Sequence, residues 1–163
     1  MSASFDLSPY QDPATIQRLL HGSKTVAVVG LSKNELRASF FVGFYLRRHG
    51  YTVIPVNPRQ PEILGVRCYQ SLTDVGEPVD IVNVFRASDA VPEIAREAVA
   101  TGAKAIWCQF GVINKEGARI AEEGGLSVIM DRCIKVEHAR YVGRMHWLGF
   151  NTQRITSVRG GLQ

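Results

Sequence analysis

The stretch VAVVGLSKNELRAS, from Val26 to Ser39, decides the fold class of this chain. Its first four residues are small or β-branched and apolar, which is typical of a strand buried in a parallel sheet. The run ends at Gly30, which lets the chain turn without a Cβ atom, and a short polar segment follows. In an α/β protein, such a turn between a strand and a helix is a common place to bind a phosphate group. The dinucleotide fingerprint needs three glycines in this turn, and only one is present.

Apolar segments alternate with helix-length segments along the rest of the chain. The patterns predict strands at 25–30, 51–58, 79–85, 104–111 and 126–131, with a shorter one at 66–69. They predict helices at 12–21, 39–50, 88–103, 114–125 and 133–143 and a helical turn at 71–75, with Ser88 and Asn114 as N-caps. This alternation predicts the α/β class, as a Rossmann-like doubly wound parallel sheet with helices on both faces.

A length of 163 residues suits one domain, and no repeat, low-complexity segment or linker divides the sequence. We therefore expect a single domain over 1–163. Its core lies at about 25–138, the helix 12–21 precedes it and a C-terminal arm at 144–163 follows it. Trp147, Leu148 and Phe150 make this arm apolar, so it suits packing on the domain itself, on a second copy in a homodimer, or on a partner enzyme.

The composition argues against several classes of function. The net charge is +4, but the basic residues are spread along the chain without interleaved aromatic residues, so nucleic acid is not the expected partner. No apolar run is long enough to span a bilayer, and the first residues, MSASFDLSPYQD, do not resemble a secretory signal. Cys68, Cys108 and Cys133 have no zinc-binding spacing. We therefore expect a cytoplasmic protein with no metal site and no membrane partner.

In a doubly wound sheet, ligands bind outside the carboxyl ends of the strands, so the residues after each strand are candidates for the site. After the first strand, Ser32, Lys33 and the N–H groups of the turn can face a phosphate, and Arg37 can grip a second one. The second strand ends at Asn57-Pro58, where an NAD-binding domain usually has an acidic residue for the ribose. Arg59 lies close by and could instead bind the 2′-phosphate of NADP, so this alternative stays open.

The later strand exits add an aromatic ring, a cation and a side-chain amide. Phe85 and Arg86 can stack on a base and meet a phosphate, although Phe85 can equally pack under the next helix while Arg86 stays solvated. Gln109 and Gly111 follow the next strand, where an amide and a closely approaching backbone can contact a ligand. Trp107, inside that strand, is expected in the core.

Taken together, these strand exits resemble a known family. The phrases VVGLS, GYTVIPVNP, EILGVRCYQSL, VDIVNVFR, GAKAIWCQFGV and MDRCIKVEH occur in this order from about Thr25 to His138. They resemble the small, stand-alone CoA-binding proteins, a family similar to the N-terminal CoA-binding domain of the succinyl-CoA synthetase α subunit. The tail phrase LGFNTQRITSVR also resembles the C-terminal segment of that family. Any single phrase is unspecific, whereas the ordered set is specific.

The resemblance implies that coenzyme A, or an acyl-CoA, is the small-molecule nucleotide ligand. It assigns the CoA phosphates to the turn after Gly30 and the adenosine end to the strand exit at Phe85 and Arg86. The strand exit at Gln109 to Val112 would contact the pantetheine or adenine side. The candidate cofactor-binding residues are Gly30, Leu31, Ser32, Lys33, Asn34, Arg37, Asn57, Pro58, Arg59, Phe85, Arg86, Gln109, Gly111 and Arg132.

One segment departs from the pattern of the family. The family commonly has P-x-R-P-S after the first turn, whereas NELRAS keeps Arg37 and Ser39 and loses both prolines. A loop without these prolines is expected to be less rigid, because proline fixes the backbone φ angle. Alternatively, Glu35 opposes an incoming phosphate. Either effect bears on affinity rather than on the fold.

The resemblance also bears on catalysis. The related synthetase carries a phosphorylated histidine on a second domain that this sequence does not contain, and none of the four histidines follows a predicted strand. We therefore expect binding without catalysis. The alternatives are an NAD(P)-binding oxidoreductase and a nucleotide-sensing subunit that use the same crevice. The residues before the first strand are too few for the DNA-binding domain that a sensing repressor would carry.

Asp131, Arg132 and Cys133 form the one reactive-looking cluster. A cysteine beside an arginine and near a helix N-terminus can have a lowered pKa, which would allow a mixed disulfide with the CoA thiol. The alternative, which we favour, is that Asp131 caps the last helix, Arg132 pairs with a carboxylate and Cys133 is buried. We expect no catalytic residues in this chain.

Overall fold

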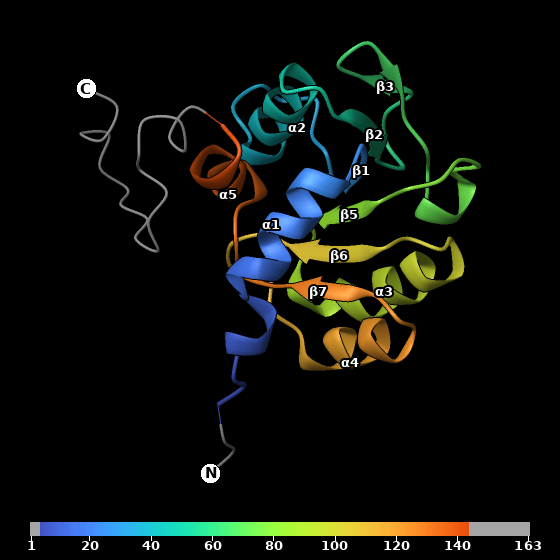
Figure 1. Ribbon diagram of the computed structural model, residues 1–163. Coiled ribbons are helices and arrows are strands. Elements are labelled where there is room, and N and C mark those ends of the chain that lie inside the picture. The colour runs from blue at the N-terminus through green and yellow to red at the C-terminus, as the bar shows by residue number, and fades with distance from the viewer. Residues whose placement is uncertain (1–3, 144–163) are drawn as a thin grey trace.

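Five parallel strands form the central sheet of the protein, whose computed structural model describes residues 4–143 (Figure 1). The strands are β1 (Thr25–Val29), β2 (Thr52–Val56), β5 (Ile81–Val84), β6 (Ala105–Cys108) and β7 (Ser127–Ile129). They lie in the order β2-β1-β5-β6-β7. After β1 the chain adds β2 on one side and then returns to add β5 on the other. The carboxyl ends of β1 and β5 therefore flank the topological switch point, where ligands of such sheets bind.

Helices cover both faces of this sheet (Figure 1). On one face lie α1 (Pro13–Gly22), α2 (Ala38–Arg48) and α5 (Ile134–Tyr141), and on the other lie α3 (Val91–Ala100) and α4 (Lys115–Glu123). Val26 and Val28 of β1 pack against the helices α1, α2 and α5, whereas Ala27 and Val29 pack against α3 and α4. Because both faces of β1 are buried, an uninterrupted apolar strand is required there. The Rossmann-like doubly wound fold is confirmed, and each helix and long strand predicted from the sequence is present.

A small antiparallel hairpin, β3 (Glu62–Ile63) and β4 (Val66–Arg67), lies between β2 and β5 along the chain. Its turn contains Leu64 and Gly65, both with positive φ. The short strand expected at 66–69 is present as β4, and Tyr69 adds an isolated bridge to β2. The sequence did not predict β3, since two residues are too short to form a pattern. Three 3-10 turns are η1 (Ser8–Tyr10), η2 (Leu72–Asp74) and η3 (Ser88–Ala90).

The two predicted N-caps have different outcomes. The side chain of Asn114 caps α4 by accepting a hydrogen bond from the backbone N–H of Gly117 at 2.8 Å, as predicted. The prediction that Ser88 caps a helix is wrong, because Ser88 begins η3 and α3 has no side-chain cap. Instead, the hydroxyl of Ser88 accepts from the N–H of Ile113 and donates to the carbonyl of Gly111. The loop before α4 runs beside Ser88, and only the tertiary fold brings it there.

The arm expected at 144–163 lies outside the described residues. Within 4–143, no helix is long and apolar enough to cross a bilayer. In the same part of the chain, no group of three or more His, Cys, Asp or Glu side chains is arranged to hold a metal ion.

Candidate functional site

Gly30 brings three strand exits together at the switch point. Its φ of +93° lies in the left-handed region, and a Cβ atom there would stand only 2.7 Å from the carbonyl oxygen of Phe85 and 3.0 Å from Cδ of Arg86. The N–H of Gly30 also donates to the carbonyl of Val56, the last residue of β2, at 3.0 Å. The first turn therefore touches the exits of both neighbouring strands, and only glycine fits at this crossing.

The turn after Gly30 is shaped by its own polar side chains. The N–H of Ser32 donates to the hydroxyl of Ser39 at 3.0 Å, and the N–H of Asn34 donates to the hydroxyl of Ser32 at 3.0 Å. The side chain of Leu31 is fully buried, so it anchors the turn rather than facing a ligand. Ser39 thus fixes the backbone of the turn at Ser32, and the hydroxyl of Ser32 keeps its own hydrogen to donate.

Asn57 clamps the exit of β2 against the first turn. Its Nδ2 donates to the carbonyl of Leu31 at 3.0 Å, and its Oδ1 accepts from the N–H of Arg59 at 2.8 Å. Asn57 stands where an NAD-binding domain has an acidic residue that binds the ribose. Here its side chain has a structural role instead. Beyond it, Pro58 and Arg59 are exposed and line a cavity of about 720 Å³.

Four cations surround the switch point. Lys33, Arg37, Arg59 and Arg86 are all exposed. Within residues 4–143, none of them forms an ion pair with a carboxylate. Their charges are therefore available to an anion that binds at the carboxyl ends of β1, β2 and β5. Phe85 is half-buried beside this group and packs against the α1, α2 and α5 layer.

Gln109, Gly111 and Arg132 form a second group, at the exits of β6 and β7. Gln109 is buried, and its Oε1 accepts from Nδ2 of Asn83 at 3.0 Å and from the N–H of Ile134 at 3.1 Å. The N–H of Gly111, at a φ of +77°, donates to Oδ1 of Asp131 at 2.7 Å. The structure thus commits the amide oxygen of Gln109 to bracing α5, while the backbone N–H of Gln109 donates to the carbonyl of Val84 at the end of β5 at 3.3 Å.

Arg132 is likewise held by the protein itself. Its guanidinium donates to Oε1 of Gln11 and to the carbonyl of Asp131, and its Nε lies 3.8 Å from Oε1 of Glu137. The expected pairing with a carboxylate is therefore present, and Cys133 is buried as expected. The prediction that Asp131 caps the last helix is wrong, because Cys133 is the N-cap residue of α5 and Asp131 turns back to Gly111.

The core prediction for Trp107 is confirmed. Its side chain is fully buried, and its indole Nε1 donates to the carbonyl of Arg132 at 2.9 Å. This bond satisfies the single polar atom of the ring. It also ties β6 to the start of α5.

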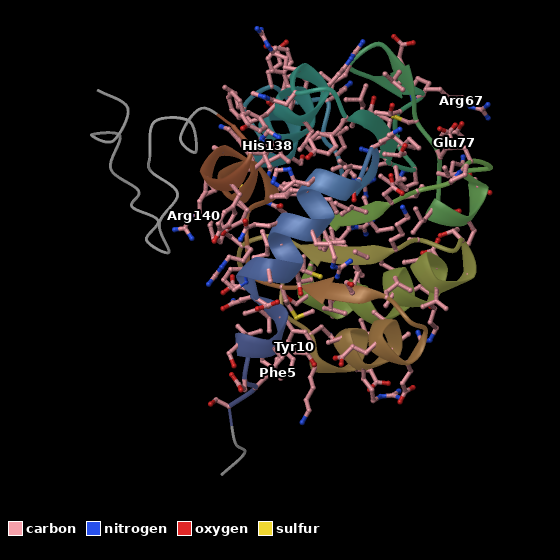
Figure 2. The ribbon with its side chains drawn as sticks, in the orientation of Figure 1. Phe5, Tyr10, Arg67, Glu77, His138 and Arg140 are labelled. Carbon is pink, nitrogen blue, oxygen red and sulfur yellow. The ribbon has the colours of Figure 1, made fainter. Side chains whose placement is uncertain are left out.

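The burial of His138 was not predicted from the sequence. This histidine is 3 % exposed, and its Nδ1 shares a hydrogen bond of 2.9 Å with the hydroxyl of Tyr45 on α2. Figure 2 labels it where α5 meets α2. Burial, with a smaller contribution from His49 and then His21, lowers the pKa of His138 to about 4. His138 therefore packs as a neutral side chain between two helices.

Residues 24–139 match the family model described as CoA binding domain. This chain belongs to the CoA binding domain family. The matched segment contains the first turn, the exit of β2 with its hairpin, and the exits of β5 and β6. The resemblance drawn from the ordered phrases of the sequence is thereby confirmed.

Relatives of this CoA binding domain include both small proteins and parts of large enzymes. The uncharacterized protein YneT of Bacillus subtilis is 46% identical over 126 residues, which are 77% of this chain and 93% of YneT. A hypothetical protein from Pyrococcus horikoshii OT3 superposes with a TM-score of 0.81 at 33% identity, over 87% of this chain and 100% of that one.

The large relatives are ligases. Acetate--CoA ligase [ADP-forming] II of Archaeoglobus fulgidus is 31% identical over 101 residues, which are 61% of this chain but only 15% of the ligase. The dinucleotide forming acetyl-coenzyme A synthetase 1 of Ca. Korarchaeum cryptofilum superposes with a TM-score of 0.59 at 26% identity, over 68% of this chain and 26% of that one. The CoA binding domain is thus similar to a minor part of these enzymes, and their overall activity is a property of much longer chains.

Proposed function

We propose that the protein binds coenzyme A, or an acyl-CoA, at the carboxyl ends of β1, β2 and β5, without catalysing a reaction of its own. One observation carries the proposal. The turn at Gly30 meets the exits of β2 and β5 at the switch point, in a chain whose residues 24–139 match the CoA binding domain family. Ligands of doubly wound sheets bind at this point.

The charges of the site suit the phosphates of CoA. Lys33 and Arg37 flank the first turn, and Arg59 stands beyond β2; all three are exposed and free of ion pairs within the described residues. Ammonium and guanidinium groups bind phosphate oxygens, the guanidinium in a two-pronged manner. The diphosphate would lie at the Ser32–Lys33 turn, and Arg86, whose side chain lies beside Gly30, would meet it from the exit of β5.

The pantetheine arm would run from the switch point toward the exits of β6 and β7. Gln109 and Arg132 would shape its path, because the amide oxygen of Gln109 already holds Ile134 and the guanidinium of Arg132 already holds Gln11. Gly111 is exposed and offers backbone without a side chain. The thiol or acyl end would then be presented at the surface, where a partner enzyme can reach it.

A nicotinamide dinucleotide is the competing ligand for the same crevice. The geometry favours it less, since the side chain of Asn57 is committed to Leu31 and Arg59 and offers no carboxylate to a ribose. The turn also has one glycine instead of three.

Calorimetric titration of ligand-stripped protein with CoA, and with NADH in parallel, tests the proposal. We expect saturable heat with CoA and none with NADH. The double variant Ser32→Asp/Lys33→Glu should weaken CoA binding by at least about tenfold, because it places negative charge beside the diphosphate. Lys115→Glu, an exposed charge reversal on α4, is the matched control and should bind as the native protein does. Unchanged affinity in the double variant would move the phosphate site elsewhere, and NADH binding alone would overturn the proposal.

A further inference from the structure

A cavity beside the switch point contains residues that the proposed function has not used. It measures about 720 Å³, a size typical of small-molecule sites. It lies between the exit of β2, strand β4 of the hairpin and the turn η2. Its lining consists of Pro58, Arg59, Gln60, Pro61, Arg67, Cys68, Tyr69, Gln70 and Asp74.

Asn57 links the first turn to the start of the cavity lining. The lining begins at Pro58, one residue after the side chain that donates to the carbonyl of Leu31. The turn at Ser32–Lys33 and the cavity therefore meet at the carboxyl end of β2, where one extended nucleotide could contact both. This places the cavity within reach of the same nucleotide.

Two arginines make one side of the cavity attractive to an anion. Arg59 and Arg67 are exposed, and neither forms an ion pair within residues 4–143. The guanidinium of Arg67 lies 5.0 Å from the centre of the Tyr69 ring, an arrangement that limits the motion of the side chain. Its cross-strand neighbour Glu62 does not reach it within ion-pair distance. Figure 2 shows Arg67 at the outer edge of the hairpin.

The rest of the lining suits a nucleoside rather than a bare anion. Asp74 supplies a carboxylate, one oxygen of which accepts from the hydroxyl of Ser71 at 3.0 Å. This carboxylate would repel a free phosphate but can accept a hydrogen bond from a ribose hydroxyl or a base amino group. Gln60 and Gln70 add neutral amides. The combination of two cations, one acceptor and an aromatic ring fits a ribose that carries a phosphomonoester.

We propose that this cavity binds a phosphomonoester on the ribose of the bound nucleotide, and that Arg67 is the residue that recognises it. The inference rests on the proposed function, in which the nucleotide is CoA and the group is its 3′-phosphate. The 2′-phosphate of NADPH has the same chemistry. Arg67, with Arg59 beside it, would thus decide between phosphorylated and unphosphorylated forms of the ligand.

Three matched pairs of ligands test the inference by calorimetry: CoA with dephospho-CoA, adenosine 3′,5′-bisphosphate with AMP, and NADPH with NADH. We expect CoA to bind about tenfold or more tightly than dephospho-CoA, since a charge-assisted bond to the phosphate is gained. In Arg67→Gln, CoA binding should fall to the level of dephospho-CoA, whose own affinity should not change. Arg67→Lys keeps the charge and should retain part of the preference. Arg96→Gln, an exposed arginine on α3, is the control.

The outcomes separate the two proposals. Equal binding of CoA and dephospho-CoA by the native protein overturns this inference and leaves the proposed function standing. A preference for CoA that survives in Arg67→Gln overturns the role of Arg67. Preference for NADPH over NADH with no CoA binding keeps the phosphomonoester site and overturns the proposed function. Failure of all three pairs to bind overturns both. Circular dichroism and thermal unfolding of each variant establish that the fold is retained, as the exposure of Arg67 leads us to expect.

Discussion

At the scale of single residues, the candidate site depends on a close approach between the turn at Gly30 and the backbone at the exit of β5. Gly30 stands where the turn after β1 crosses the exit of β5, and its absent side chain leaves room for the carbonyl of Phe85. Gly50 has nearly the same backbone angle, with a φ of +92°, but open space around it. The two glycines therefore separate the cost of a positive φ from the cost of a steric clash.

Gly30→Ala should destabilise the protein much more than Gly50→Ala. A positive φ costs an alanine about 1–2 kcal/mol at either position. At Gly30 the new methyl group also meets a backbone carbonyl at 2.7 Å, which adds about 1–3 kcal/mol because backbone cannot rotate away. Urea unfolding of both variants measures the difference. Equal losses of unfolding free energy would mean that the first turn and the exit of β5 are not in contact.

At the scale of elements, two glycines let α4 pack closely on α3. A Cβ atom at Gly117 would lie 2.4 Å from Cγ1 of Val91, and one at Gly124 would lie 2.3 Å from Cγ2 of Val99. Alanine elsewhere in a helix is favoured over glycine by about 1 kcal/mol. The two glycines are therefore explained by the short distance between α3 and α4, which leaves no room for a Cβ atom, and not by helix propensity.

Gly117→Ala should be destabilising despite the gain in helix propensity. Val91 is fully buried, so its methyl group has little room to move, and overpacking of about 1–3 kcal/mol should exceed the gain of about 1 kcal/mol. In the double variant with Val91→Ala, the clash is removed and the two substitutions should couple favourably. A double-mutant cycle of unfolding free energies measures this coupling. Strictly additive effects would contradict the close packing of α3 and α4.

At the scale of the whole molecule, burial of ionisable groups makes stability depend on pH. His138 has a pKa lowered from 6.5 to about 4 in the folded protein. Below pH 6.5 the unfolded chain binds a proton at this histidine that the folded protein does not. The free energy of unfolding therefore falls as the pH falls from about 6.5 to about 4, and His138 adds no further loss below that range.

The contribution of His138 should be about 2 kcal/mol between pH 7 and pH 5. Glu137, whose pKa is raised by burial, titrates with the opposite sign and has to be separated from it. Urea unfolding of the native protein and of His138→Asn at both pH values isolates the histidine, because Glu137 is common to both. The variant should lose less stability over this range than the native protein does. His21→Asn, at an exposed position, is the control and should leave the native pH dependence nearly unchanged.

Ligand binding should stabilise the molecule as a whole. At a CoA concentration about 100 times its Kd, binding to the folded state alone adds about 2.7 kcal/mol and should raise Tm by about 5–10 °C. Ser32→Asp/Lys33→Glu should show little of this shift at the same concentration, with a similar Tm in the absence of CoA. Differential scanning calorimetry gives both values. A full shift in the double variant would argue against the first turn as the phosphate site.

The sequence by itself determined the order of strands and helices along the chain, the parallel sheet and the family, whereas the strand order that locates the switch point came from the structure. These properties follow from local signals: apolar runs of strand length, helical periodicity, and glycines at the ends of elements. Each is carried by neighbouring residues, so it can be recognised without knowing how distant segments meet. The apolar character of β1 alone required burial on both faces of the sheet.

Only the tertiary structure decided which polar side chains at the strand ends are free. Asn57, Gln109 and Arg132 all stand where sequence reasoning placed ligand contacts, yet each bonds to a segment at least 25 residues away in the chain. The cavity between Arg59 and Arg67 and the burial of His138 were likewise invisible in the sequence. The physical reason is that a hydrogen bond, a cavity or a desolvated imidazole depends on distances between elements, and a linear pattern does not contain those distances.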